Sequence, residues 1–141
     1  MLKVELLAPL ASDVVTSISG FTESTRDGRL YNAAAVYHRG AVIGIYRKLF
    51  PATRRSVYEA GNKTPVFDVD GLKFGIVICR DSNYFEPARI MAAPGATALF
   101  VPTNNDGAGG MYRPMPQSLR STPDCCGLRN VSGVSKYDLN Y

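Results

Sequence analysis

The first half of the chain alternates short apolar runs with turn residues, a pattern typical of antiparallel strands. An apolar stretch from Val14 to Phe21 predicts one strand, and the runs Tyr31–Tyr37 and Ala41–Arg47 predict two more. The tripeptide His38–Gly40 separates the last two runs. It predicts a short hairpin loop, with glycine where a positive φ is needed. His38 is then most simply an exposed turn residue.

The second half combines another hairpin with a strand–helix–strand unit. The apolar runs Val66–Val69 and Leu72–Ile78 lie on either side of Asp70–Gly71, a dipeptide favoured in type I′ turns. A polar turn follows, and then a helix is predicted from Glu86 to about Ala93, because an acidic residue and a proline both suit a first helical turn. Thr97–Val101 predicts a final strand. Hairpins followed by a strand–helix–strand unit indicate an α/β sandwich.

The two ends of the chain carry weaker patterns. Residues 2–11 predict a short helix, since Leu2, Leu6 and Leu10 recur every fourth position. From Ala108 onward, glycines and prolines interrupt the chain, and neither a helical nor a strand period is present. We therefore expect an irregular tail over residues 108–141.

Composition places the chain among ordinary globular proteins. It has 141 residues, enough for one domain, with 45% apolar and 20% charged residues. No apolar stretch approaches the length of a membrane span, so no membrane association is predicted. Three cysteines do not make a disulfide framework. Cys125 and Cys126 are adjacent in sequence and the chain has a single histidine, so the ligand spacing of a zinc site is absent from the sequence. We predict a cytoplasmic protein without a metal.

The net charge of +4 and the pI of about 9.1 raise the question of nucleic-acid binding. The basic residues are scattered, apart from Arg47–Lys48 and Arg54–Arg55, and no aromatic residues alternate with them. A solvated basic surface explains this distribution better than a nucleic-acid site does.

Cys79 is the candidate for chemistry. It lies between the carboxyl end of the strand predicted at Leu72–Ile78 and the helix that begins at Glu86, where α/β folds place reactive residues. The helix N-terminus beyond it would favour a thiolate. On its own, a cysteine that ends a strand is more often a buried structural residue. Its sequence neighbours decide between the two interpretations.

Two motifs provide these neighbours. The segment ICRDSNYFEPAR contains Cys79, and YRKLFP contains Lys48 about thirty residues earlier. In this order, they resemble the cysteine and lysine motifs of the nitrilase (carbon–nitrogen hydrolase) superfamily, and the resemblance covers roughly residues 14–105. It implies a four-layer αββα sandwich and a small amide, carbamoyl compound or nitrile as substrate.

The resemblance also implies roles for individual residues. Cys79 matches the nucleophile that forms a thioester intermediate, Lys48 matches the family's lysine, and the backbone N–H of Arg80 takes the oxyanion role because it directly follows the nucleophile. No metal or organic cofactor is implied. Asn104 and Asn105, at the end of the last predicted strand, are candidates for lining the pocket.

The resemblance implies a catalytic glutamate upstream of the first predicted strand, and we expect the chain to start too late to contain it; Glu5 and Glu23 lack its surrounding motif. We therefore expect a nitrilase-like αββα sandwich that is incomplete at both ends. A partial carbon–nitrogen hydrolase domain would span 1–107. Two functions stay open, a carbon–nitrogen hydrolase and an inactive truncated or degenerate domain with at most a role in binding. Uncovered sheet edges predict a homo-oligomer.

Overall fold

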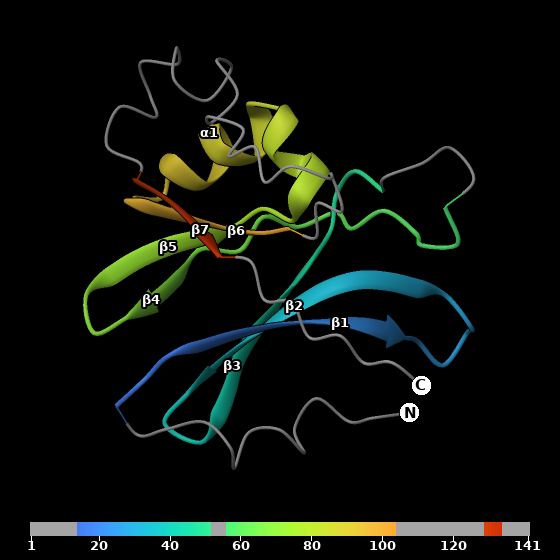
Figure 1. Cartoon of the computed structure of the whole chain (residues 1–141), viewed down its shortest axis with the longest axis horizontal. Coiled ribbons are helices and arrows are strands. Elements are labelled where there is room, and N and C mark those ends of the chain that lie inside the picture. Colours follow the sequence, from blue (N-terminus) through green and yellow to red (C-terminus); the bar gives the residue numbers. More distant parts are fainter. Residues whose placement is uncertain (1–13, 52–55, 104–128, 134–141) are drawn as a thin grey trace.

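Two β-sheets face each other, and one of them carries a helix on its outer side (Figure 1). The computed structural model describes residues 14–51, 56–103 and 129–133. The expected helix at 2–11 lies outside them. The elements are β1 (Ser17–Ser24), β2 (Leu30–His38), β3 (Ala41–Arg47), β4 (Phe67–Val69), β5 (Leu72–Ile76), the 3₁₀ helix η2 (Cys79–Asn83), α1 (Glu86–Ala92), β6 (Ala98–Pro102) and β7 (Arg129–Gly133).

The first sheet is antiparallel, in the order β1-β2-β3. Strand β3 has the predicted bounds. Arg39 and Gly40 form its two-residue turn with β2, and both have positive φ angles (47° and 72°), as a type I′ turn requires. His38 is therefore the last residue of β2 rather than an exposed turn residue. Its ring is only 15% exposed and makes a hydrogen bond to Thr16 Oγ1.

Strand β1 lies three residues later than the predicted strand Val14–Phe21. Pairing with β2 sets its bounds, from Ser17 opposite Tyr37 to Ser24 opposite Leu30. Val14 is 90% exposed and lies before the first residue of β1. Apolarity alone misplaced this strand, because the polar residues at its far end gain ladder hydrogen bonds that a hydrophobic pattern does not reveal.

The second sheet has the order β4-β5-β6-β7, with β4 antiparallel to β5 and the other pairs parallel. Asp70 and Gly71 both have positive φ angles (50° and 86°), so the predicted turn between β4 and β5 is confirmed. The last strand predicted at Thr97–Val101 is shifted by one residue. Helix α1 provides the crossover between β5 and β6, and it begins at Glu86 as expected.

Strand β7 lies within the segment that we expected to be irregular, so that expectation is wrong for Arg129–Gly133. This strand pairs in parallel with β6, from Arg129 opposite Ala98 to Gly133 opposite Pro102. The sequence RNVSG has one large apolar residue, so only the partner strand identifies it. The rest of 108–141 lies outside the described residues.

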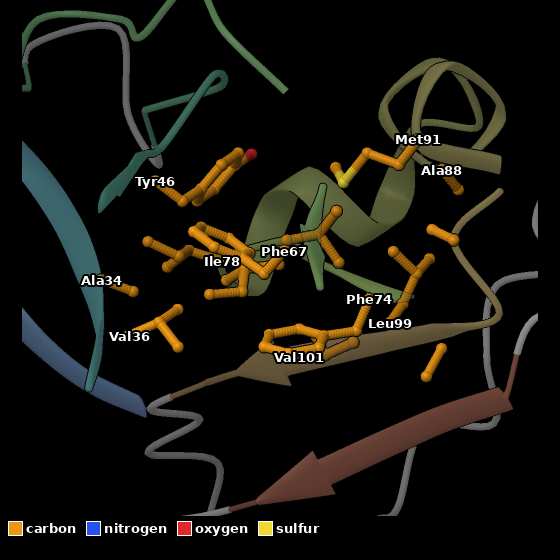
Figure 2. Packing of buried hydrophobic residues seen from close by; sticks show 14 residues of the cluster. Ala34, Val36, Tyr46, Phe67, Phe74, Ile78, Ala88, Met91, Leu99 and Val101 are labelled. Carbon is orange, nitrogen blue, oxygen red and sulfur yellow. The ribbon is translucent and has the colours of Figure 1, made fainter. Parts of the chain in front are cut away.

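The core fills the space between the sheets and the space beneath α1 (Figure 2). Ala34 and Val36 contribute from β2, while Phe67, Phe74 and Leu99 contribute from the second sheet. Their burial supplies the main stabilisation, at roughly 25 cal/mol per Å² of apolar surface removed from water. In the described part of the chain, no helix is long and apolar enough to cross a membrane.

The tips of the two hairpins also touch. Asp70 in the β4–β5 turn accepts a hydrogen bond from Arg39 Nη2 at 3.1 Å and lies 3.8 Å from His38 Nε2. These contacts join the sheets at the turn ends of their hairpins. Being largely exposed, the Arg39–Asp70 pair contributes at most about 1 kcal/mol.

Gly75 allows α1 to approach β5 closely. A Cβ at this position would overlap Met91 Sδ and lie 2.9 Å from Leu99 Cδ2. We expect Gly75→Ala to lower the free energy of unfolding by about 1–3 kcal/mol, because the added methyl overpacks the core. Urea denaturation measures this change. Gly20→Ala is the control, since the nearest atom to its added Cβ is 3.9 Å away; equal effects of both substitutions would contradict the prediction.

Candidate active site

Lys48 lies just beyond β3, and its backbone is held on both sides. Its N–H donates to Asn32 O and its carbonyl accepts from Gly61 N–H, both at 2.8 Å. A Cβ at residue 61 would overlap the Arg47 carbonyl, so only glycine permits this close approach. The Lys48 side chain is 3% exposed, and its ammonium donates to the carbonyl oxygen of Ile78. The lysine motif is thus brought from the first sheet to the residue that precedes Cys79.

Cys79 occupies a strained turn. Its φ is 47°, a left-handed conformation that costs a non-glycine residue of order 1–3 kcal/mol and that clusters at functional sites. Cys79 begins η2 and is partly exposed, and Ser82 Oγ donates to its carbonyl oxygen at 2.7 Å. A reactive side chain on a sharp strand-to-helix turn projects from the end of its sheet, where a substrate can reach it.

Asp81 is the site residue that the sequence analysis missed. It is fully buried, and its carboxylate accepts three hydrogen bonds: from Tyr46 Oη at 2.7 Å, from Phe50 N–H at 2.8 Å and from Ile78 N–H at 3.1 Å. These donors belong to the lysine segment and to the residue before Cys79. In a sequence Asp81 resembles any polar turn residue. The available signal was Tyr46, which faces the core from β3 and needs a polar partner for its hydroxyl.

These hydrogen bonds explain why β5 is shorter than the predicted strand Leu72–Ile78. The Ile78 N–H donates to Asp81 Oδ2, and the Ile78 carbonyl accepts from the Lys48 ammonium and from Asp81 N–H. Both backbone groups of Ile78 are thereby engaged outside the β-ladder. Val77 N–H still donates to Phe100 O of β6 at 3.0 Å, so groups of the site replace those of the neighbouring strand from Ile78 onward.

Burial and the charge of Asp81 shift the pKa of Lys48 in opposite directions and that of Tyr46 in the same direction. Burial lowers the pKa of Lys48 below the usual lysine value, while the nearby charges of Asp81 and Cys79 raise it and Arg80 lowers it. Burial raises the pKa of Tyr46, and the charge of Asp81 raises it further. Tyr46 therefore stays a neutral hydroxyl that donates to Asp81.

Two aromatic rings flank the site segments. Phe50 stacks on Tyr84 with ring centroids 3.9 Å apart. The backbone N–H of Phe50 donates to the Asp81 carboxylate, and that of Tyr84 donates to the Asp81 carbonyl. Arg80, next to Cys79, is exposed, and its Nη2 lies 3.5 Å from Tyr84 Oη. The segment around Lys48 (residues 46–50) and the segment around Cys79 (residues 78–84) are thus packed against each other at Asp81.

Glu23 is paired with a residue outside the candidate site. Glu23 forms a two-pronged ion pair with Arg47, at 2.6 and 2.7 Å, on the face of the first sheet opposite the core. Together with Ile45, Asn62 and Lys63, this pair lines a shallow hollow that does not include Cys79. Across the described residues, the hydrogen bonds and ion pairs of Lys48 and Cys79 include no glutamate.

The other predicted site features can be placed only in part. Asn104 and Asn105 lie outside the described residues, so their pocket role stays a prediction. Among residues 14–51, 56–103 and 129–133, no three His, Cys, Asp or Glu side chains converge as a set of metal ligands. The structure brings the Lys48 ammonium to the carbonyl of Ile78, the residue before Cys79.

Lys48→Met should remove a pH-dependent part of the stability. The pKa of Lys48 is lowered in the folded chain, whereas the unfolded chain keeps the ordinary value of 10.5. Between these two values the unfolded state binds more protons, so the Lys48 term makes stability rise with pH. At pH values below the pKa of Lys48 in the folded chain, the free-energy cost of burying its charge is fully present. We expect the difference in unfolding free energy, wild type minus variant, to increase from neutral pH towards pH 10.5 in urea titrations. A difference that does not change with pH contradicts this.

Comparison with known proteins identifies the family. The carbon-nitrogen hydrolase family matches residues 5–124, past the boundary expected at residue 107. The protein named hydrolase in pqqF 5′ region, from Pseudomonas protegens, is 36% identical over 104 residues, 70% of this chain and 36% of that protein. A nitrilase from Pyrococcus abyssi is 34% identical over 100 residues, 70% of this chain and 38% of the relative.

The fold agrees with the sequence match. The crystal structure of a carbon-nitrogen hydrolase from Helicobacter pylori superposes with a TM-score of 0.61 at 30% identity, over 70% of this chain and 35% of that one. The chain thus spans little more than a third of the length of these relatives. Its α/β architecture is that of the αββα sandwich of the nitrilase superfamily. Because the family match extends over most of the 141 residues, the chain belongs to the carbon–nitrogen hydrolase family.

Proposed function

We propose that the chain carries the cysteine and lysine of a carbon–nitrogen hydrolase that acts on a small non-peptide amide, carbamoyl compound or nitrile. The observation that carries this proposal is the buried Lys48 ammonium bound to the carbonyl of Ile78, one residue before a cysteine in a left-handed turn. Burying a lysine is costly, and a structural role would be filled more cheaply by an apolar side chain. Membership of the family supports the assignment.

In the first half of the proposed reaction, the Cys79 sulfur bonds to the carbonyl carbon of an amide while a general base takes the thiol proton. The negative charge that develops on the substrate oxygen is stabilised by the Lys48 ammonium and by the backbone N–H of Arg80. The ammonium has three N–H groups and donates one to Ile78 O; in this proposal another donates to the substrate oxygen.

In the second half, the C–N bond breaks, and the base returns its proton to the leaving ammonia or amine. The remaining acyl group is a thioester of Cys79. Water attacks this thioester, the base takes a proton from the water, and the carboxylic acid leaves as the thiol re-forms. The family resemblance implies a glutamate as this base, and the hydrogen bonds of Lys48 and Cys79 within the described residues include none. No step requires a metal or an organic cofactor.

A second candidate is a domain that binds or associates without turnover. The observation that favours it is the engagement of the carboxylates: Asp81 accepts three hydrogen bonds, and Glu23 is paired with Arg47. If no other group supplies the base, Cys79 can react with a strong electrophile but cannot turn over an amide, because a general base contributes typically about 10²–10⁴-fold. A cytoplasmic location stays a prediction in both cases.

We expect Cys79 to be the most reactive of the three thiols. Limited treatment with iodoacetamide, followed by peptide mass spectrometry, compares it with Cys125 and Cys126 in the same sample. Preferential labelling of either of these two, with Cys79 inert in the folded protein, would count against the site.

Turnover separates the two candidate functions. Ammonia release from a panel of small amides, carbamoyl compounds and nitriles should disappear in Cys79→Ala and fall by about 10²–10³-fold in Lys48→Met. Mass spectrometry of the quenched reaction should show an acyl adduct on Cys79. Labelling of Cys79 without turnover or an adduct would support the second candidate instead.

We also propose that the chain self-associates. Ile43 and Ile45 are 41% and 37% exposed on β3, an edge strand of the first sheet in its described extent, and exposed apolar edge strands favour pairing with another chain. Analytical ultracentrifugation should show a concentration-dependent oligomer that the double variant Ile43→Lys/Ile45→Lys weakens. A wild-type monomer at all concentrations contradicts this proposal.

A further inference from the structure

Asp81 and Lys48 are the charged side chains buried in the described part of the chain. The Asp81 carboxylate is fully buried and accepts three hydrogen bonds, from the hydroxyl of Tyr46 and from the backbone N–H groups of Phe50 and Ile78. A general base must reach the proton that it takes, and a fully buried carboxylate whose hydrogen bonds go to the chain itself is better placed to hold that chain.

The donors to Asp81 come from the two segments that carry the reactive groups. Tyr46 and Phe50 lie two residues before and two residues after Lys48, and Ile78 immediately precedes Cys79. The Asp81 carboxylate therefore binds the lysine segment through two hydrogen bonds, one on either side of Lys48. It fastens the cysteine segment at a third point, next to the left-handed turn.

The backbone of Asp81 completes the arrangement. Its N–H donates to Ile78 O at 3.1 Å, and its carbonyl accepts from Tyr84 N–H at 3.2 Å. Together with Asp81 Oδ2 accepting from Ile78 N–H, these bonds close the turn that holds Cys79 at a φ of 47°. A strained residue keeps its conformation only where the surrounding structure holds it from several sides.

We propose that Asp81 is a positioning residue, whose buried carboxylate holds the Cys79 thiol and the Lys48 ammonium in one reactive arrangement. This inference rests on the proposed function of the Cys79–Lys48 pair. The negative charge of Asp81 also helps to keep the buried ammonium protonated, because it offsets part of the effect of burial on the pKa of Lys48. Asp81 therefore acts through two other residues and not on the substrate.

A double-mutant cycle on thiol alkylation tests this role without knowledge of the substrate. The rate of Cys79 alkylation by iodoacetamide is measured by peptide mass spectrometry in the wild type, Lys48→Met, Asp81→Asn and the double variant. We expect Lys48→Met to slow alkylation by about tenfold in the wild-type background, and by less than about twofold in the Asp81→Asn background. A merely structural role for Asp81 would lower the melting temperature and leave the effect of Lys48→Met unchanged in the folded protein.

Two further variants make the test independent of folding. Tyr46→Phe removes one of the three donors and keeps the aromatic ring in the core, so it decides the outcome if Asp81→Asn does not fold; it should reduce the effect of Lys48→Met to an intermediate value. Asp70→Asn is the matched control. It makes the same charge change at the other end of β5, and Asn–Gly suits the type I′ turn there. It should preserve the full tenfold effect.

The outcomes separate the two ideas. If Lys48→Met slows alkylation equally in the wild-type, Tyr46→Phe and Asp81→Asn backgrounds, Asp81 does not position the pair, and only this inference is overturned. If Lys48→Met leaves the wild-type rate unchanged, the proposed pairing of Lys48 with Cys79 fails, and the inference fails with it.

Discussion

The cost of burying charge governs the structure around Cys79. An ammonium and a carboxylate removed from water are stable only if hydrogen bonds and opposite charge compensate them. Lys48 meets this requirement with the Ile78 carbonyl and the nearby charge of Asp81, and Asp81 meets it with three donors. This requirement engages both backbone groups of Ile78 outside the β-ladder and ties the chain after β3 to the turn that contains Cys79.

Much of the fold could be predicted because local chemistry specifies it. Asp70–Gly71 specifies a type I′ turn, and Glu86–Pro87 specifies the start of α1; both features are present. Strand β1 was misplaced and β7 was missed, since partner strands rather than apolar runs define them. Hydrophobic patterns locate a strand well where its apolar residues are periodic, and poorly where pairing with a neighbouring strand sets its bounds.

The candidate site shows the same division. Cys79 and Lys48 could be proposed from the sequence because their two motifs, in this order, resemble those of a known family. Asp81 was missed because burial of a polar residue depends on three donors, two of them about thirty residues away. A tyrosine on the core face of a strand, such as Tyr46, is the one local sign that a buried polar partner exists. The oxyanion role of the Arg80 backbone N–H stays a proposal, which rests on its position directly after Cys79.

The contacts that build the site also have a kinetic consequence. The bonds from Lys48 to Ile78, from Phe50 to Asp81 and from Tyr46 to Asp81 join residues 30, 31 and 35 positions apart. Each hairpin can close locally, but neither hairpin alone contains both the thiol and the ammonium. Contacts this distant in sequence incur loop-closure entropy before they contribute stability, and they slow folding. The Cys79 thiol therefore acquires its environment only when the two sheets dock, so the rate at which its reactivity appears during refolding reports on that docking step.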